Sequence, residues 1–374
     1  MDPVDLAARL IACPSITPRE EGSLGVLREV LEALGFTVHR FAAGSAPEGS
    51  VENLVATRGT GSPHFAFAGH VDVVPPGPGW TGDPFVPEVR GGLLYGRGAV
   101  DMKSAIAAFV AACADVPEHS GTLSLLITGD EEGPALYGTR AIMDWMAARD
   151  MRPDMIVIGE PTSEERLGDV VKIGRRGSVN MVVTVPGVQG HVAYPHRADN
   201  PVPKLARVVL ALDALHLDDG NDAFQASNLE ITDVRTGNGA TNVIPGVATV
   251  QLNIRFNNLQ RGADLVDLVR RTVADVVPGA TVDAKISGEA FLTPPGPVYD
   301  IVRDAIAAET GISPRLSTGG GTSDGRFLIA LCPVIDFGLP NATMHKLDEA
   351  AAVEDIRALR RIYARVIRSA LPVG

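Results

Sequence analysis

The sequence predicts an α/β fold: a mostly parallel sheet with helices on both faces, and a smaller α+β domain inserted into it. Short apolar segments alternate with helical ones through residues 1–176 and again through residues 290–374, which is typical of parallel sheets. Residues 177–289 instead contain longer strands in which apolar and polar side chains alternate. The chain has 374 residues, and a single core stops growing at roughly 250–300 residues, so we expect two domains.

The composition is that of an ordinary globular protein, with 45% hydrophobic and 21% charged residues. The formal net charge of −12 argues against binding to nucleic acid or to anionic membrane surfaces. We expect neither a signal peptide nor a transmembrane segment, because no basic region precedes an apolar run. Cys13, Cys113 and Cys332 are widely spaced and odd in number, which indicates core thiols in a reducing cytoplasm rather than a disulfide framework.

Capping residues mark the first two helices of the larger domain. Asp2 followed by Pro3 is typical of a helix start, and Gly35 ends a second helix whose leucines recur at helical spacing. Apolar runs bounded by turn residues place the other elements, and residues 75–98, which are rich in Gly and Pro, predict a long loop followed by a short strand. The expected helices cover residues 3–12, 20–34, 102–114 and 136–148, and the expected strands cover 37–41, 53–57, 65–68, 122–128 and 154–158.

The inserted segment predicts a small α+β domain of the ferredoxin-like kind, because four strands of alternating pattern are combined with two helices. Its strands are expected at residues 178–185, 228–233, 247–256 and 281–286, and its helices at 200–212 and 263–276. The first pattern then returns, with a Gly-rich turn at residues 318–324. The closing elements are a helix at 298–309, a strand at 334–337 and a helix at 353–369.

A histidine and an aspartate stand together at the end of the strand at residues 65–68. Residues i and i+2 of a strand face the same side, so His70 and Asp72 can point together out of its carboxyl end. Open α/β sheets bind ligands at that edge. An imidazole with a carboxylate beside it is half of a metal site, in which the carboxylate orients the ligand or its neighbours.

Further candidate ligands lie after predicted strands or near one. Each has an ordinary explanation when taken alone, such as a helix cap for Asp101 or a surface turn for His345. Together with His70 they make two imidazoles and four carboxylates that can converge on one edge of the sheet, and this predicts a metal centre. The candidates are Asp101, Glu131, Glu132, Glu160 and His345.

The number of candidates indicates two cations rather than one, because one catalytic ion needs about three protein ligands. Asp101 would bridge the pair, as in hydrolases whose metals lie roughly 3.5–4 Å apart. Imidazole and carboxylate without thiolate favour Zn²⁺, with Co²⁺ or Mn²⁺ as alternatives. The adjacent Glu131 and Glu132 point opposite ways in extended chain. One can therefore bind metal while the other acts as general base and proton donor.

These residues lie in motifs that resemble the di-zinc amidohydrolases of the aminoacylase and carboxypeptidase clan. The resemblance covers essentially the whole chain in order, with one departure at Gly129, where we expected serine. The clan motifs are residues 69–75, 95–103, 130–132, 159–161 and 344–346, and motifs at 174–178, 189–196, 242–245 and 319–327 resemble a subgroup that hydrolyses N-succinyl-LL-2,6-diaminopimelate. The resemblance implies a zinc aminopeptidase-like catalytic domain and an inserted dimerisation or lid domain.

The resemblance also implies the role of each residue at the metal centre. His70 and Glu160 would bind one zinc, Glu132 and His345 the other, and Asp101 would bridge them. Glu131 would be the general base, and Asp72 would orient His70. The family further carries a cis peptide bond after the bridging aspartate, here between Asp101 and Met102.

A homodimer is part of the same resemblance. His191 in the inserted domain would reach the partner subunit's site and stabilise the oxyanion there. The substrate carries several carboxylates, which arginine side chains bind in bidentate geometry. The residues that match family substrate positions are Arg175, Ser178, Tyr194, Asn242, Arg255, Thr322 and Asn341.

Three other functions remain open at this point, and one of them, a structural or interaction protein, gives no reason for six convergent ligand types. The chain could be another amidase of the clan, acting on acetylornithine or on dipeptides. It could also be a catalytically inactive module that holds metal on the same scaffold.

Overall fold

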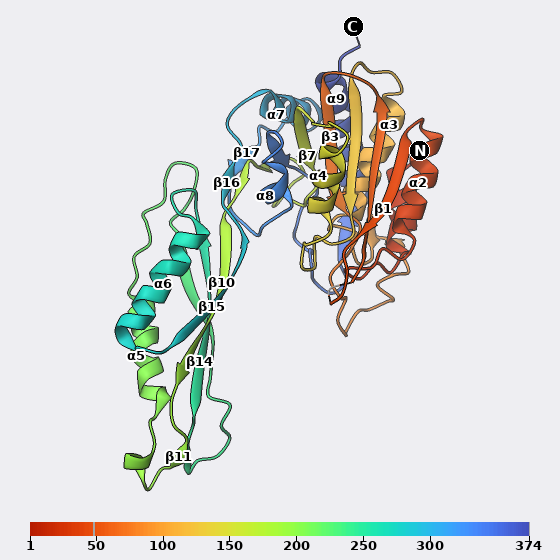
Figure 1. The fold of residues 1–374 in the computed structure, drawn as a ribbon. Helices are drawn as coiled ribbons and strands as arrows, with labels where there is room; N and C mark the ends of the chain where they lie inside the picture. The colour runs from red at the N-terminus through yellow and green to blue at the C-terminus, as the bar shows by residue number, and fades with distance from the viewer. Residues whose placement is uncertain (48, 374) are drawn as a thin grey trace. The chain divides into compact units, whose positions relative to one another are not determined.

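The computed structural model describes residues 1–47 and 49–373, and the chain divides into two compact units. Unit 1 comprises Met1–Gly174, Thr293–Ser317 and Ser323–Gly374, and unit 2 comprises Arg175–Leu292 and Thr318–Thr322. Figure 1 shows helices and strands of both units. Glu48 and Gly374, which the predicted catalytic domain includes, lie outside the described residues.

Unit 1 is built on an eight-stranded sheet. Strand β3 pairs in parallel with β6 on one side and β7 on the other, and β7 pairs in parallel with β18. The strands pair in antiparallel orientation at β1–β2, β2–β6 and β18–β8. The strand order is β1 (Thr37–Ala43), β2 (Val51–Gly59), β6 (Thr122–Thr128), β3 (His64–His70), β7 (Met155–Ile158), β18 (Val334–Asp336), β8 (Val170–Lys172) and β17 (Arg315–Ser317).

Helices cover both faces of this sheet, as the sequence predicts. Successive residues of a strand face opposite sides, so Phe65 and Phe67 of β3 join one apolar core while Ala66 and Ala68 join another. The larger core packs against α1 (Pro3–Ile11), α2 (Ser23–Ala33), α3 (Lys103–Asp115), α7 (Pro297–Thr310) and α9 (Val353–Ala370). The smaller core packs against α4 (Thr139–Ala147) and α8 (Gly325–Leu328).

A small three-stranded sheet accompanies the main one in unit 1. Its strands are β19 (Ala350–Ala352), β5 (Leu93–Tyr95) and β4 (Glu88–Arg90), in that order and all antiparallel. The pairing of β19 with β5 joins two chain segments that each adjoin a predicted metal ligand, because His345 precedes β19 and Asp101 follows β5.

Unit 2 has the ferredoxin-like order that the sequence predicts: strand, helix, two strands, helix, strand. All pairings in its four-stranded sheet are antiparallel, and one apolar core lies between the sheet and the two helices. The sheet order is β12 (Asn228–Arg235), β14 (Val247–Phe256), β10 (Gly177–Pro186) and β15 (Thr281–Gly288), and the helices are α5 (Pro201–Asp213) and α6 (Gly262–Val276). Short strands β11 (Gly190–His191) and β13 (Val243–Ile244) pair with each other, as do β9 (Gly174–Arg175) and β16 (Phe291–Leu292), and Pro195–Arg197 form one turn of 3₁₀ helix.

Among the described residues, the helices are all too short or too polar to cross a lipid bilayer.

Candidate metal centre

The carboxyl ends of three neighbouring strands supply most of the candidate ligands. His70 is the last residue of β3, two residues beyond the expected strand at 65–68, and it is held there by its pairing with Thr128 of β6. Glu131 and Glu132 follow β6, and Glu160 follows β7. Because β6, β3 and β7 are adjacent and parallel, these side chains meet at one edge of the sheet.

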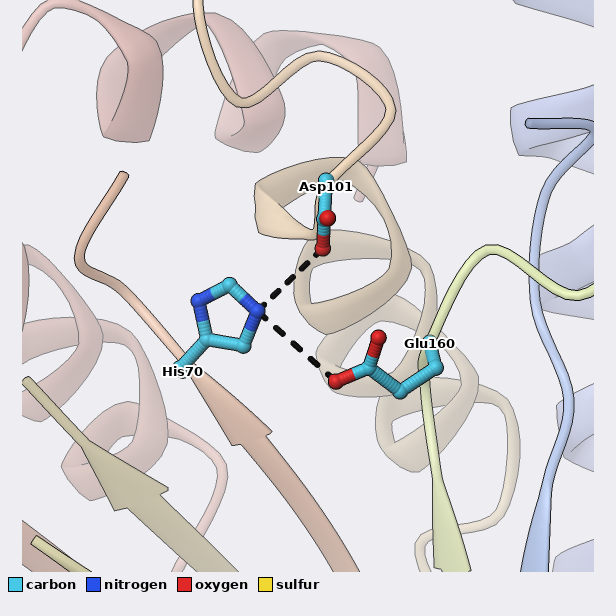
Figure 2. Close-up of side chains that lie close together, drawn as sticks. All are labelled: His70, Asp101 and Glu160. Atoms are coloured by element: carbon cyan, nitrogen blue, oxygen red, sulfur yellow. Dashed lines mark hydrogen bonds and ion pairs between the residues drawn. The ribbon is translucent and has the colours of Figure 1, made fainter. Parts of the chain in front are cut away.

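A first ligand set joins His70, Asp101 and Glu160 (Figure 2). The imidazole Nε2 of His70 lies 3.2 Å from Oδ1 of Asp101 and 3.8 Å from Oε1 of Glu160. All three residues are buried. Asp101 does not cap helix α3, whose first turn has no side-chain cap. The Asp101–Met102 peptide bond is cis, as the family resemblance implied.

A second ligand set shares Asp101 with the first and adds Glu132 and His345. Nε2 of His345 lies 2.8 Å from Oε1 of Glu132 and 3.2 Å from Oδ2 of Asp101. The two oxygens of the Asp101 carboxylate therefore face different histidines. Hydrogen bonds to Asp101 and Glu132 raise the pKa of His345 to about 10, so positive charge is favoured at this position.

The residues of both sets fit divalent cations. Within each set the ligand atoms lie within 4.8 Å of one another. The side chains of Asp101, Glu132 and Glu160 are only 7–10% exposed, so three carboxylate ligands are gathered away from solvent, as they are in metal sites. Imidazole and carboxylate donors without thiolate suit Zn²⁺ and related ions.

Asp72 organises the centre without joining either ligand set. Its main-chain carbonyl oxygen lies 2.9 Å from Nδ1 of His70, and its carboxylate lies 3.6 Å from that atom. The carboxylate instead accepts hydrogen bonds from the backbone N–H groups of Glu131 and Glu132, at 3.3 and 3.1 Å. Burial raises the pKa of Asp72 to about 6, while the nearby His70 opposes that rise.

Glu131 has a raised pKa, which is typical of residues that transfer protons. Removal from water and the negative charge of Glu160 raise its pKa well above the ordinary value of 4.5. It belongs to neither ligand set, whereas the adjacent Glu132 does. The geometry thus separates the two glutamates, in the same way that the family resemblance separates their roles.

The predicted substrate residues of unit 2 fall into two groups. Ser178 and Arg255 are directly opposite on β10 and β14, and Arg175 donates a hydrogen bond to the carbonyl oxygen of Gly321, beside Thr322. At the end of unit 2 that carries β11 (Figure 1), His191 contacts the ring of Tyr194 at 5.8 Å between centroids. Asn242 lies in the same group, because its carbonyl oxygen accepts a hydrogen bond from Val192. Both rings are exposed.

Asn341, the remaining predicted substrate residue, lies in unit 1. Its backbone N–H donates to Ser163, three residues after Glu160, and its carbonyl oxygen accepts from Met344, which precedes His345. Asn341 therefore lies in the segment that connects the two ligand sets.

Lys103, Asp130 and Glu349 are among the buried charged residues near the centre to which the sequence interpretation gave no role. Lys103 is the only charged residue in the first three turns of the otherwise apolar helix α3, and that isolation was a usable signal. Asp130 accepts hydrogen bonds from the backbone N–H groups of Leu136 and Tyr137, which fixes the loop after the glutamate pair. Glu349 binds backbone N–H groups beside Asp101, and no pattern of residue types identifies such a contact.

Two carboxylate–imidazole sets that share one carboxylate, at the edge of an α/β sheet, form a site of the kind that metallohydrolases use. The chain belongs to the peptidase family M20/M25/M40, whose family model matches residues 66–369.

Relatives within this family resemble the chain over almost its whole length. A succinyl-diaminopimelate desuccinylase of Rhizorhabdus wittichii is 65% identical over 371 residues, covering 99% of this chain and 98% of that protein. A succinyl-diaminopimelate desuccinylase of Sphingopyxis alaskensis is 62% identical over 368 residues, covering 98% of each. The crystal structure of a tripeptidase from Staphylococcus aureus has the same fold, with a TM-score of 0.80, 19% identity, and coverage of 98% of this chain and 97% of that one.

Proposed function

We propose that the chain hydrolyses N-succinyl-LL-2,6-diaminopimelate to succinate and LL-2,6-diaminopimelate, in the biosynthesis of diaminopimelate and lysine. The observation that carries this proposal is the pair of ligand sets that share Asp101, with Glu131 beside them. They occur in a chain that is 65% identical to a relative named for this activity.

The proposal includes two divalent cations, Zn²⁺ at both positions, with Co²⁺ or Mn²⁺ possible at one. His70 and Glu160 would hold one cation, Glu132 and His345 the other, and Asp101 would contact both. When bound, such cations polarise the amide carbonyl and lower the pKa of water.

Glu131 would carry the proton through the reaction. It takes a proton from the attacking water, whose oxygen forms a bond to the succinyl carbonyl carbon. The carbon–nitrogen bond then breaks, and Glu131 gives the proton to the leaving amine. A carboxyl group whose pKa is raised holds a proton more readily than an ordinary glutamate, and burial with the charge of Glu160 provides that rise in the pKa of Glu131.

The substrate has three carboxylates, and arginines are suited to bind them. Arg175 and Arg255 are proposed for this role, with polar contacts from the other predicted substrate residues. Arg175 is buried, so a bound carboxylate would gain a strong charge-assisted contact. The polar group comprises Ser178, Tyr194, Asn242, Thr322 and Asn341.

We further propose that residues 1–176 and 290–374 form the catalytic domain of a cytoplasmic homodimer, and that residues 177–289 form its dimerisation and lid domain. His191 is proposed to stabilise the oxyanion in the partner's site. Its exposed position in unit 2 leaves the ring free to contact a second subunit.

A substrate panel with matched variants tests the activity. The zinc-loaded protein should release succinate from N-succinyl-LL-2,6-diaminopimelate faster than it hydrolyses acetylornithine or a dipeptide. Glu131→Gln should lower kcat by about 10²–10⁴-fold while two metal ions stay bound. Preference for acetylornithine or a dipeptide would assign a different amidase activity. Metal binding without turnover of any of the three would indicate a non-catalytic metal-binding module.

Mixing two inactive variants tests the role of His191. In a dimer of one Glu131→Gln and one His191→Ala subunit, one of the two sites has both an intact glutamate and an intact partner histidine. Random mixing should therefore restore about a quarter of the wild-type activity. No recovery after subunit exchange, in a mixture shown to contain mixed dimers, would contradict transfer of His191 between subunits.

A further inference from the structure

One buried carboxylate binds the chain segment that leads into Asp101. Oε1 of Glu349 accepts hydrogen bonds from the backbone N–H groups of Val100 and Asp101, at 2.8 and 3.0 Å. Oε2 accepts from the N–H of Gly98 at 3.1 Å. The Glu349 side chain has no exposed surface, so this loop wraps closely around it.

Arg97 balances the charge of this carboxylate. Its guanidinium Nη1 lies 2.7 Å from Oε2 of Glu349, and both side chains are almost completely buried. The guanidinium also lies 5.0 Å from the ring of Trp80, in cation–π geometry. The pair is therefore shielded from solvent, and removing either charge would leave the other uncompensated.

Glu349 also belongs to the chain segment that carries His345. The carbonyl oxygen of Glu349 accepts a hydrogen bond from Gly96, so its main chain and side chain both bind the loop before Asp101. Thr343 exchanges two hydrogen bonds with the backbone of Ala350, which closes the turn around His345. His345 itself has a φ of 59°, a left-handed conformation that requires support from its surroundings.

These contacts connect two ligands of the second set through one carboxylate. Glu349 belongs to neither ligand set, and its oxygens are occupied by three backbone N–H groups and one guanidinium. We propose that Glu349 is a positioning residue that fixes Asp101 relative to His345, so that both face one cation. The inference rests on the two-cation site of the proposed function.

Two substitutions separate positioning from charge balance. Glu349→Gln removes the charge that compensates Arg97 and turns an NH₂ group towards backbone donors. Glu349→Asp keeps the charge but is one methylene shorter, so its oxygens withdraw from the N–H groups of Val100 and Asp101. Glu354→Gln is the matched control, because that exposed glutamate pairs with Arg357 at the surface only five residues away.

The test is calorimetric titration of Zn²⁺ into protein stripped by a chelator, with thermal unfolding and succinyl-diaminopimelate kinetics on the same samples. We expect Glu349→Asp and Glu349→Gln to weaken one of two zinc-binding steps by about 10–100-fold, and to lower kcat more than they raise KM. The Glu354→Gln control should match the wild type in zinc binding and in kinetics.

The inference is overturned if folded Glu349→Asp binds both ions within twofold of wild type. It is also overturned if both binding steps weaken equally, or if the wild type binds fewer than two ions. If Glu349→Gln fails to fold, zinc binding to Glu349→Asp is the deciding measurement. If neither variant folds, Glu349 has a structural role and the positioning inference is overturned. Wild-type protein that binds two ions without cleaving the succinyl substrate would refute the proposed function and leave this inference standing.

Discussion

His70 donates a hydrogen bond through Nδ1 to the main-chain carbonyl oxygen of Asp72, at 2.9 Å. A carbonyl oxygen can only accept, so this bond assigns the ring proton to Nδ1. Nε2, which faces Asp101 and Glu160, is then the nitrogen that can bind a metal once it has lost its own proton. The sequence interpretation gave the orienting role to the Asp72 side chain, whereas the closer contact comes from its backbone.

Asp72→Asn should therefore disturb the two glutamates rather than His70. The substitution keeps the main-chain carbonyl but replaces one acceptor oxygen, facing Glu131 N or Glu132 N, with an NH₂ donor. We expect kcat/KM to fall about 10–100-fold, by analogy with other residues that support metal ligands. Steady-state kinetics and zinc titration check this, with the exposed Asp222→Asn as control. Full activity in Asp72→Asn would show that these two backbone contacts are dispensable.

Removing metal should destabilise the fold, because a cation that binds the assembled ligand sets stabilises the native state and not the unfolded chain. An ion present at 100 times its Kd stabilises the native state by about 2.7 kcal/mol per site. A chelator should lower the Tm of unit 1, and added Zn²⁺ should restore it. Equal amounts of Mg²⁺ should restore less, since imidazole ligands suit Zn²⁺ better. A Tm that does not respond to the chelator would contradict this prediction.

The longer elements of the fold could be predicted because their patterns are strong. The expected bounds of the strands at 122–128 and 247–256 match β6 and β14 to the residue. Three-residue strands such as β8 and β17 were missed, because a periodicity of two cannot be recognised over so few residues. The antiparallel pairing of β2 with its two neighbours was also not predicted, since tertiary packing sets the direction of a neighbouring strand.

The candidate ligands could be predicted because histidine, aspartate and glutamate side chains that follow predicted strands are typical metal ligands. Both ligand sets contain only residues that the sequence had identified. Glu349 could not be found in this way, because its partners are mainly backbone N–H groups, which every residue except proline has. The carbonyl contact of Asp72 with His70 is hidden for the same reason.

The aromatic cluster in the larger core should contribute strongly to stability. Phe109 is fully buried on α3, with its ring 4.1 Å from that of Phe67 and 5.5 Å from that of Tyr363. Phe109→Ala removes these contacts and leaves a cavity, so the free energy of unfolding should fall by about 3–5 kcal/mol. Phe109→Leu should lose less, since it fills more of the space. Urea unfolding measures both, and a loss below about 1 kcal/mol for Phe109→Ala would mean that the core collapses around the gap.

Because Lys103 is buried, the free energy of unfolding should change with pH in the alkaline range. Its ammonium group donates hydrogen bonds to the carbonyl oxygens of Leu10, in the last turn of α1, and of Cys13, just after that helix, at 2.9 and 2.8 Å. Burial lowers its pKa to about 8 from an ordinary 10.5, although nearby acidic groups, including Asp72 and Glu349, oppose the shift. Between pH 8 and 10.5 the unfolded chain therefore binds a proton that the folded chain has released.

The contribution of Lys103 to stability should rise with pH across that window, because its side chain binds more protons in the unfolded state there. The gain attributable to Lys103 should be about 3 kcal/mol, since each pKa unit corresponds to about 1.4 kcal/mol. Lys103→Met cannot titrate, so the wild-type free energy of unfolding should increase relative to the variant between pH 8 and 10.5. Urea unfolding of both proteins at several pH values measures this, with the exposed Lys285→Met as control. Parallel pH profiles for wild type and Lys103→Met would show that Lys103 keeps its proton in the folded protein throughout this range.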